Sequence, residues 1–240
     1  MSEGFEAREA RYRKFKEKNP QASFAQYLMR RQLRTLGNGN TTGALSVALG
    51  EREEFWSAGE SKAKKLMSAM TLAPHHKAIE YGCGSLRVGA HFIRALATDG
   101  FFGLDVIDGF YEIGKAMIGA ELLAAKAPRF GIIGEPALAE AAQFAADFVY
   151  SNVVCVHVHP DEVDAYFHDL ARLTHKRGAR LVFNAALFER PVRYAFDGWA
   201  WPLEFYRQSL AGLDCVRTDL GRSQNRNGHE ITPVELEFRR

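Results

Sequence analysis

The sequence predicts an α/β protein in which helices cover both faces of a mostly parallel sheet. Over the last two thirds of the chain, short apolar runs alternate with segments whose apolar residues recur at helical spacing. The first apolar run, Ala78–Tyr81, ends in the turn Gly82-Cys83-Gly84, and the second, Phe101–Asp105, ends in a carboxylate. Because ligands of such sheets bind beyond the carboxyl ends of the strands, we expect a ligand site there.

Length and composition fit one domain with an additional segment. The chain has 240 residues, of which 47% are apolar and 25% charged, as is ordinary for a globular protein. No apolar run approaches the roughly 18 residues of a membrane span, and the N-terminus lacks the apolar core of a signal peptide. We therefore expect a cytoplasmic protein without a membrane partner. The three cysteines form no Cys-x-x-Cys pair, which argues against a disulfide framework or structural zinc, and we predict no bound metal.

The first part of the chain predicts several helices. The first of them carries many charges and has little apolar surface to bury. The second is amphipathic and begins at Ser23, a residue type that caps helix N-termini. The predicted helices are residues 3–18, 23–36, 44–54 and 61–70.

We interpret residues 1–76 as a helical arm and lid, and residues 77–240 as the ligand-binding domain. The first 36 residues hold nine Lys/Arg and four acidic residues, a net charge of +5, whereas the remainder carries −3. A basic arm is typical of contact with nucleic acid or an acidic partner. Because acids interleave with the bases, we favour a solvated helix face over that partner.

After the arm, the pattern predicts seven strands with helices between them. The strands are residues 78–81, 101–105, 129–133, 147–154, 179–184, 213–218 and 230–238. The helices are residues 85–97, 109–125, 137–143, 160–173 and 202–211. The turn-rich residues 221–228 join the last two strands, which predicts a hairpin.

The glycine turn and two acidic residues resemble a known motif. Glu80 precedes Gly82 and Gly84 in the pattern Glu-x-Gly-x-Gly, and Asp105 lies 21 residues after Gly84. Arg87 stands where the dinucleotide fingerprint has its third glycine, which disfavours a nucleotide-dependent oxidoreductase. The pattern resembles motifs I and II of the class I S-adenosylmethionine (SAM)-dependent methyltransferases, and among them small enzymes that act on metabolites and glycans.

This resemblance implies a fold, a cofactor and an activity. The implied fold is a Rossmann-like, doubly wound sheet of seven strands whose last strand is antiparallel. The implied cofactor is SAM, with Glu80 and the turn from Gly82 to Gly84 at its methionine end and Asp105 at its ribose. Many members have Asp where this chain has Glu80. The implied activity is methyl transfer to a small-molecule or glycan-like acceptor.

Further residues are expected at the cofactor. These candidates are Trp56, Cys83, Arg87, Val106, Glu135, Ser151 and Asn152. Trp56 belongs to a Trp-x-x-Gly stretch that, in resembling enzymes, closes over the cofactor; the alternative is a buried aromatic that fixes the lid. Glu135 follows the third strand, where the resemblance implies an acid that binds the adenine amino group. Ser151 and Asn152 end the fourth strand, next to the methyl group.

The acceptor side is expected beyond the fourth strand. Resembling enzymes that methylate amino groups of bases carry Asn/Asp-Pro-Pro-Tyr here, whereas this chain has Ser-Asn-Val-Val, which disfavours adenine and cytosine as acceptors. His157 is our candidate catalytic residue, because histidine titrates near neutral pH and suits a general base. The alternatives are a helix-capping or packing role, and a metal site that combines His157 and His159 with Asp161 or His168.

An aromatic-rich segment, residues 188–201, follows the fifth strand. We expect it to face the substrate, because aromatic rings exclude water and stack on a flat acceptor or sugar. Arg190 and Arg193 are candidates for a carboxylate or phosphate on that acceptor; core packing is the alternative for the aromatics. The predicted partner is thus a small-molecule or glycan acceptor, nucleic acid is not favoured, and a homo-oligomer stays open. The alternative function is a non-catalytic SAM-fold protein whose basic arm binds RNA or a protein.

Overall fold

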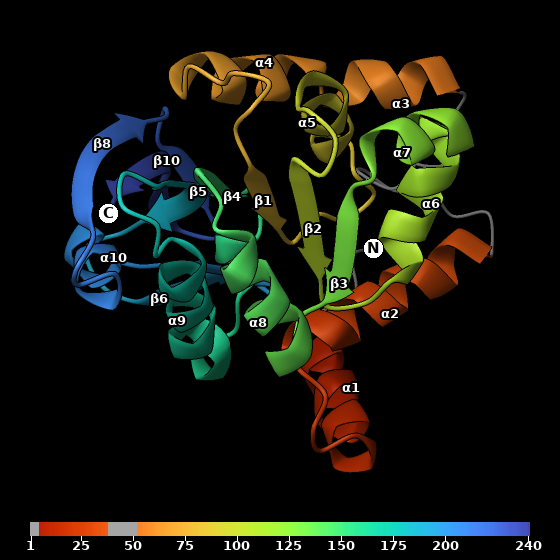
Figure 1. The fold of residues 1–240 in the computed structure, drawn as a ribbon. Coiled ribbons are helices and arrows are strands. Elements are labelled where there is room, and N and C mark those ends of the chain that lie inside the picture. The colour runs from red at the N-terminus through yellow and green to blue at the C-terminus, as the bar shows by residue number, and fades with distance from the viewer. Residues whose placement is uncertain (1–4, 38–51) are drawn as a thin grey trace.

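The fold is built around a central β-sheet. The computed structural model describes residues 5–37 and 52–240. Its strands are β1 (Ala78–Tyr81), β2 (Phe101–Asp105), β3 (Arg129–Ile132), β4 (Phe148–Ser151), β5 (Arg180–Leu187), β6 (Val192–Ala195), β7 (Gly198–Ala200), β8 (Asp214–Leu220), β9 (Gln224–Arg226) and β10 (His229–Arg239). The main strand order is β3-β2-β1-β4-β5-β10-β8 (Figure 1).

The strand directions confirm the predicted fold class. β1 to β5 are mutually parallel where they pair, whereas β10 is antiparallel to both β5 and β8. The short β9 pairs with β10, and β6 pairs with β7 in a separate hairpin. The sheet is therefore doubly wound and Rossmann-like, with the antiparallel last strand that the sequence predicts.

Ten α-helices lie in the described residues. They are α1 (Phe5–Lys18), α2 (Phe24–Gly37), α3 (Arg52–Ala58), α4 (Glu60–Ala69), α5 (Gly89–Ala95), α6 (Gly109–Ile118), α7 (Ala120–Lys126), α8 (Glu135–Phe144), α9 (Val163–Leu173) and α10 (Leu203–Ser209). Two short 3₁₀ helices, Cys155–His157 and Pro160–Glu162, precede α9. None of the helices in the described ranges combines the length and apolar character needed to span a bilayer.

Two apolar clusters fill the two sides of the sheet. Successive strand residues point to opposite faces, so Ile79 packs in one cluster and Ala78 in the other. The Ile79 cluster includes Leu170 and is completed by α8, α9 and α10. The Ala78 cluster includes Leu66 and Phe92, from α4 and α5. Because both faces are covered, the loops at the strand ends remain for ligand binding.

Some predicted boundaries are wrong for local reasons. The helix predicted over 85–97 begins only at Gly89, because the preceding turn places Leu86 at φ 62°. The helix predicted over 109–125 is two helices, since Gly119 interrupts it at φ 93°. The first residues of the helix predicted over 44–54 lie outside the described residues.

The N-terminal helices pack against the hairpin β6–β7. The predicted cap is confirmed, because Ser23 Oγ accepts from Gln26 N at 3.0 Å while Gln26 Oε1 accepts from Ser23 N at 3.1 Å. The expectation that the first helix has little to bury is wrong. Its Tyr12 and Phe15 pack against a cluster formed by Phe24, Tyr27, Leu28, Phe196 and Trp199.

Candidate functional site

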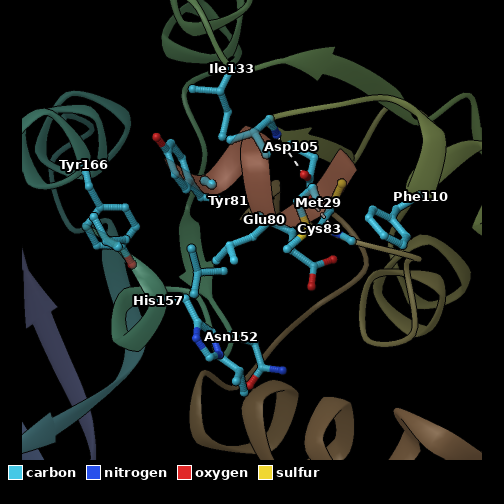
Figure 2. A pocket seen from close by; sticks show the side chains of 18 of the residues that line it. Met29, Glu80, Tyr81, Cys83, Asp105, Phe110, Ile133, Asn152, His157 and Tyr166 are labelled. Carbon is cyan, nitrogen blue, oxygen red and sulfur yellow. Dashed lines mark hydrogen bonds between the residues drawn. The ribbon is translucent and has the colours of Figure 1, made fainter. Parts of the chain in front are cut away.

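A cavity of about 680 Å³ opens at the carboxyl ends of β1, β2 and β4. Residues of α2 and α9 and the α3–α4 junction complete its lining. Figure 2 shows Tyr81, Tyr166 and Ile133 on one side of it, and Cys83 and Phe110 on the other. The candidates from the sequence that line it are Glu80, Gly82, Cys83, Gly84, Arg87, Asp105, Val106, Asn152 and His157.

The carboxylate of Asp105 is bound to the glycine turn of the neighbouring strand. Its Oδ2 accepts from Gly84 N at 2.7 Å, and its Oδ1 accepts from Val106 N at 2.8 Å. Burial raises the pKa of Asp105, and these backbone hydrogen bonds oppose the shift. Because a carboxylate has about four acceptor positions, Asp105 keeps capacity for donors of a ligand.

Glu80 contributes a buried carboxyl group to the cavity lining. The residue is 3% exposed, and its Oε2 has no hydrogen-bond partner among the described residues. Burial raises the pKa of Glu80 well above its ordinary value, although Tyr150 and Arg87 oppose the shift. A buried carboxylate without a partner is costly, so a cationic donor at this position would be bound favourably.

Arg87 supplies the opposite charge beside Glu80. Arg87 lines the cavity, and within the described parts of the chain its side chain donates no hydrogen bond. Burial lowers the pKa of Arg87, while the charge of Glu80 counteracts the shift. This end of the cavity therefore presents a basic and an acidic side chain next to each other.

Trp56 lies outside the cavity lining, which corrects its assignment to the cofactor. The Arg94 guanidinium is 3.7 Å from the centre of its ring, and His91 packs edge-on at 5.5 Å. The ring thus fixes α3 to α5, as in the packing alternative. Contact with the segment that follows the glycine turn comes instead from Gly59, where an added Cβ would be 1.8 Å from Arg87 O.

Gly59→Ala is expected to displace the α3–α4 junction from the turn. A backbone carbonyl cannot rotate away as a flexible side chain can, so we expect a loss of about 1–3 kcal/mol in the free energy of unfolding. Thermal and urea denaturation measure the loss. Gly134→Ala is the matched control, because the nearest atom to its added Cβ is 3.9 Å away. Equal stability of the two variants would contradict the close packing at Gly59.

Glu135 and Ser151 also lie outside the lining. Glu135 is held outward by Arg172 in two hydrogen bonds of 2.7 and 2.8 Å, which lower the pKa of Glu135. Ser151 is fully buried, donates to Tyr81 O at 2.9 Å and accepts from the Tyr166 hydroxyl at 2.9 Å. Existing partners satisfy both residues, so the structure corrects both assignments.

Sequence reasoning missed the contribution of α9. Glu162, directly before α9, and Ala165, Tyr166 and Asp169 of α9 all line the cavity. Their spacing of three, four and seven residues places them on one helix face, which a helical projection of the sequence would have grouped. The contribution of Met29 on α2 depends on tertiary packing and had no comparable local signal.

His157 lines the cavity with a defined tautomer. Its Nδ1 lies 2.5 Å from Asp197 O and 3.7 Å from Asp197 Oδ2. Because a carbonyl oxygen only accepts, Nδ1 donates, and Nε2 is left as the proton-accepting nitrogen. Figure 2 shows His157 and Asn152 together at one end of the cavity.

His159 does not join His157 in a common site. Its ring packs against Phe24 and Trp199, with both pairs of ring centres 5.3 Å apart or less, and its Nδ1 accepts from Asp161 N at 3.2 Å. Among the residues that the structure describes, no three potential metal ligands converge. The two histidines therefore have different environments, one at the cavity and one in an aromatic cluster.

The aromatic-rich segment over 188–201 does not face the cavity, and that expectation is wrong. Phe196 and Trp199 are buried under α2. Arg193 is bound to Phe196 O and to Glu9 of α1, so it fixes the arm to the hairpin rather than facing a ligand. Arg190 is exposed. The predicted stacking surface for an acceptor is therefore used for packing.

No protein-family model matches the chain, and no curated protein is similar to it in sequence. Solved structures are similar in fold. Magnesium protoporphyrin IX methyltransferase from Synechocystis PCC 6803 with bound S-adenosylhomocysteine (SAH) is 16% identical, with a TM-score of 0.56, over 90% of this chain and 96% of that one. Geranyl diphosphate C-methyltransferase from Streptomyces coelicolor A3(2), in complex with Mg²⁺, geranyl diphosphate and SAH, is 13% identical, with a TM-score of 0.57, over 80% and 85%.

A third similar structure is named as a cyclase and not as a methyltransferase. The [4+2]-cyclase SpnF is 14% identical, with a TM-score of 0.59, over 75% of this chain and 80% of that one. At these identities the similarities establish the fold alone. It is the Rossmann-like fold of the class I SAM-dependent methyltransferases.

Proposed function

We propose that this protein is a SAM-dependent methyltransferase with a small-molecule acceptor. The observation that carries the proposal is the pair of acidic and basic side chains that line the cavity beside the glycine turn, Glu80 and Arg87, one strand away from Asp105. The amino-acid end of SAM has an ammonium group for Glu80 and a carboxylate for Arg87. Its ribose has two hydroxyls for Asp105. The three residues thus fit the amino-acid and ribose parts of SAM.

When bound, SAM supplies a methyl group on a positively charged sulfur, which is a good leaving group. The protein must then align the acceptor for in-line displacement and exclude water. His157 Nε2 takes the acceptor proton, and the backbone carbonyl of Asp197 holds the imidazole in the required tautomer. Asn152 lies on the same side and orients the acceptor.

We propose that residues 1–76 serve as the lid of this site. Gln26 Nε2 donates to Val106 O at 3.4 Å, and Phe24 N donates to Glu162 Oε1 at 2.5 Å. α2 is thereby attached to the loop after β2 and to the segment before α9, on both sides of the cavity. Figure 1 shows α2 beyond the ends of β1, β2 and β3, consistent with a cover over the site.

Two of the similar structures are named as methyltransferases of small molecules, which supports an acceptor of this kind. A glycan acceptor has less support, because the aromatic segment that would stack on a sugar lies outside the cavity lining. The cyclase name of the third similar structure means that the fold does not by itself require methyl transfer. The activity must therefore be tested directly.

The test of methyl transfer uses metabolite pools and isotope-labelled SAM. We expect one or more small molecules to gain the mass of a labelled methyl group in the presence of the protein. His157→Ala should slow the same conversion. A labelled product that forms equally without protein, or a SAM-dependent conversion without label transfer, would contradict methyl transfer.

Glu80→Gln is expected to raise the thermal stability of the protein and to weaken its binding of SAM. The pKa of Glu80 is raised in the folded protein, so its stabilising contribution is fully present below the ordinary carboxyl pKa and is lost as the pH rises through the raised value. At pH values above the raised pKa of Glu80, the variant should therefore melt at a higher temperature than the wild type. It should also bind SAM more weakly, because the ammonium partner is lost.

Melting curves and calorimetry across pH measure both effects. Glu121→Gln, an exposed change on α7, is the control that should alter neither. A Glu80→Gln protein with wild-type SAM affinity would contradict the placement of the ammonium group at Glu80.

A further inference from the structure

A second polar group in the cavity, Asp169, lies away from the charged end formed by Glu80 and Arg87. It lines the cavity from α9 together with Tyr81 and Ile133. Tyr81 pairs in register with Leu104, the residue before Asp105, and Ile133 N donates to Asp105 O at 2.8 Å. Tyr81, Ile133 and Asp169 therefore form a corner directly beside Asp105, which we call the distal corner.

The distal corner combines flat or apolar walls with one carboxylate. In Figure 2, Tyr81 and Ile133 lie on the same side of the cavity, opposite Cys83. A ribose bound at Asp105 joins the amino-acid chain at one end and the base at the other. Because the glycine turn and the charged end take the amino-acid part, the base is left to the distal corner.

The Asp169 carboxylate is oriented and has capacity for a further donor. Its Oδ2 accepts from the Tyr81 hydroxyl at 2.8 Å, and this is its one hydrogen bond among the described residues. The nearby Arg172 is already engaged by both oxygens of Glu135. Burial raises the pKa of Asp169, while the Tyr81 hydrogen bond opposes the shift. A half-buried carboxylate of this kind favours a ligand that donates a hydrogen bond.

We propose that Asp169 accepts a hydrogen bond from the exocyclic amino group of the adenine ring, and so determines the preference of the site for an adenosyl ligand. The proposal rests on the function proposed above and concerns the base end of the same cavity. Asp169 takes the role that the sequence suggested for Glu135, whose carboxylate is bound by Arg172 and lies outside the cavity lining. Tyr81 is the positioning residue, because its hydroxyl holds one oxygen of Asp169 and directs the other toward the base.

The test compares SAH with its 6-deamino analogue, in which hydrogen replaces the amino group, by titration calorimetry. The wild type is expected to bind the analogue at least about tenfold more weakly than SAH, because the carboxylate is left without its donor. In Asp169→Asn one oxygen remains, and the Tyr81 hydroxyl engages it. The ratio of the two affinities should then fall to within about threefold.

Two further variants keep the result interpretable. Tyr81→Phe retains the ring and removes the hydroxyl, so it should reduce the ratio even where Asp169→Asn folds poorly. Glu135→Gln is the matched control and should leave the ratio unchanged. Equal wild-type affinity for the two ligands, or a ratio that responds to Glu135→Gln and not to Asp169→Asn, would overturn the proposal while SAH binding still supports the proposed function. Absence of SAH binding to the wild type would overturn both.

Discussion

Asp105→Asn is expected to weaken SAM binding by about 1.5–3 kcal/mol, which is roughly 10- to 150-fold in the dissociation constant. The loss has two causes. The amide has no charge to strengthen hydrogen bonds from the ribose hydroxyls. It also has one oxygen where the carboxylate accepts from both Gly84 N and Val106 N, so one backbone donor of the turn loses its partner.

Calorimetry with SAM and SAH measures the affinity, and thermal denaturation reports the structural part of the effect. Asp108→Asn is the matched control, because Asp108 follows the same strand but is exposed and lies outside the cavity lining. A folded Asp105→Asn protein with wild-type affinity would show that another residue binds the ribose.

His157→Ala is expected to lower kcat by roughly 10²–10⁴-fold and to leave SAH affinity almost unchanged. A general base must be unprotonated to act, so the wild-type rate should fall on the acidic side of its pH profile. This acidic limb should disappear in the variant. The profile is measured with the acceptor identified in the labelled-SAM screen.

His159→Ala provides the contrasting control. Its ring packs in the aromatic cluster with Phe24 and Trp199, so its removal should lower the melting temperature and preserve the acidic limb. A His157→Ala protein that behaves in the same way would assign His157 to packing and leave the reaction without this base.

The parts of the fold that depend on local signals were predictable from the sequence. The strands Ala78–Tyr81 and Phe101–Asp105 have the predicted bounds, because a glycine turn and a carboxylate end their apolar runs. The doubly wound sheet and its antiparallel last strand followed from a family resemblance. The hairpin β6–β7 was missed, and its Trp199 packs in one cluster with residues of α2 that are distant in the sequence.

The candidate site also has residues that local motifs predict and residues whose position depends on tertiary packing. Glu80, Asp105 and the glycine turn lie within short motifs, and the sequence was sufficient to bring them to one cavity. The orientation of Glu135 is decided by a distant partner, Arg172, which no local pattern reveals. Helical spacing groups Asp169 with Tyr166 on one face of α9, but the position of that face at the cavity depends on α9 packing beside β1.

Titration calorimetry of the wild-type protein with SAM, SAH and NADH tests the central claim most directly. The arrangement of Glu80, Arg87 and Asp105 predicts that SAM and SAH each bind at one site per chain and compete with each other, while NADH does not bind. Binding of NADH, or failure of both SAM and SAH to bind the folded protein, would contradict the assignment of this cavity to SAM.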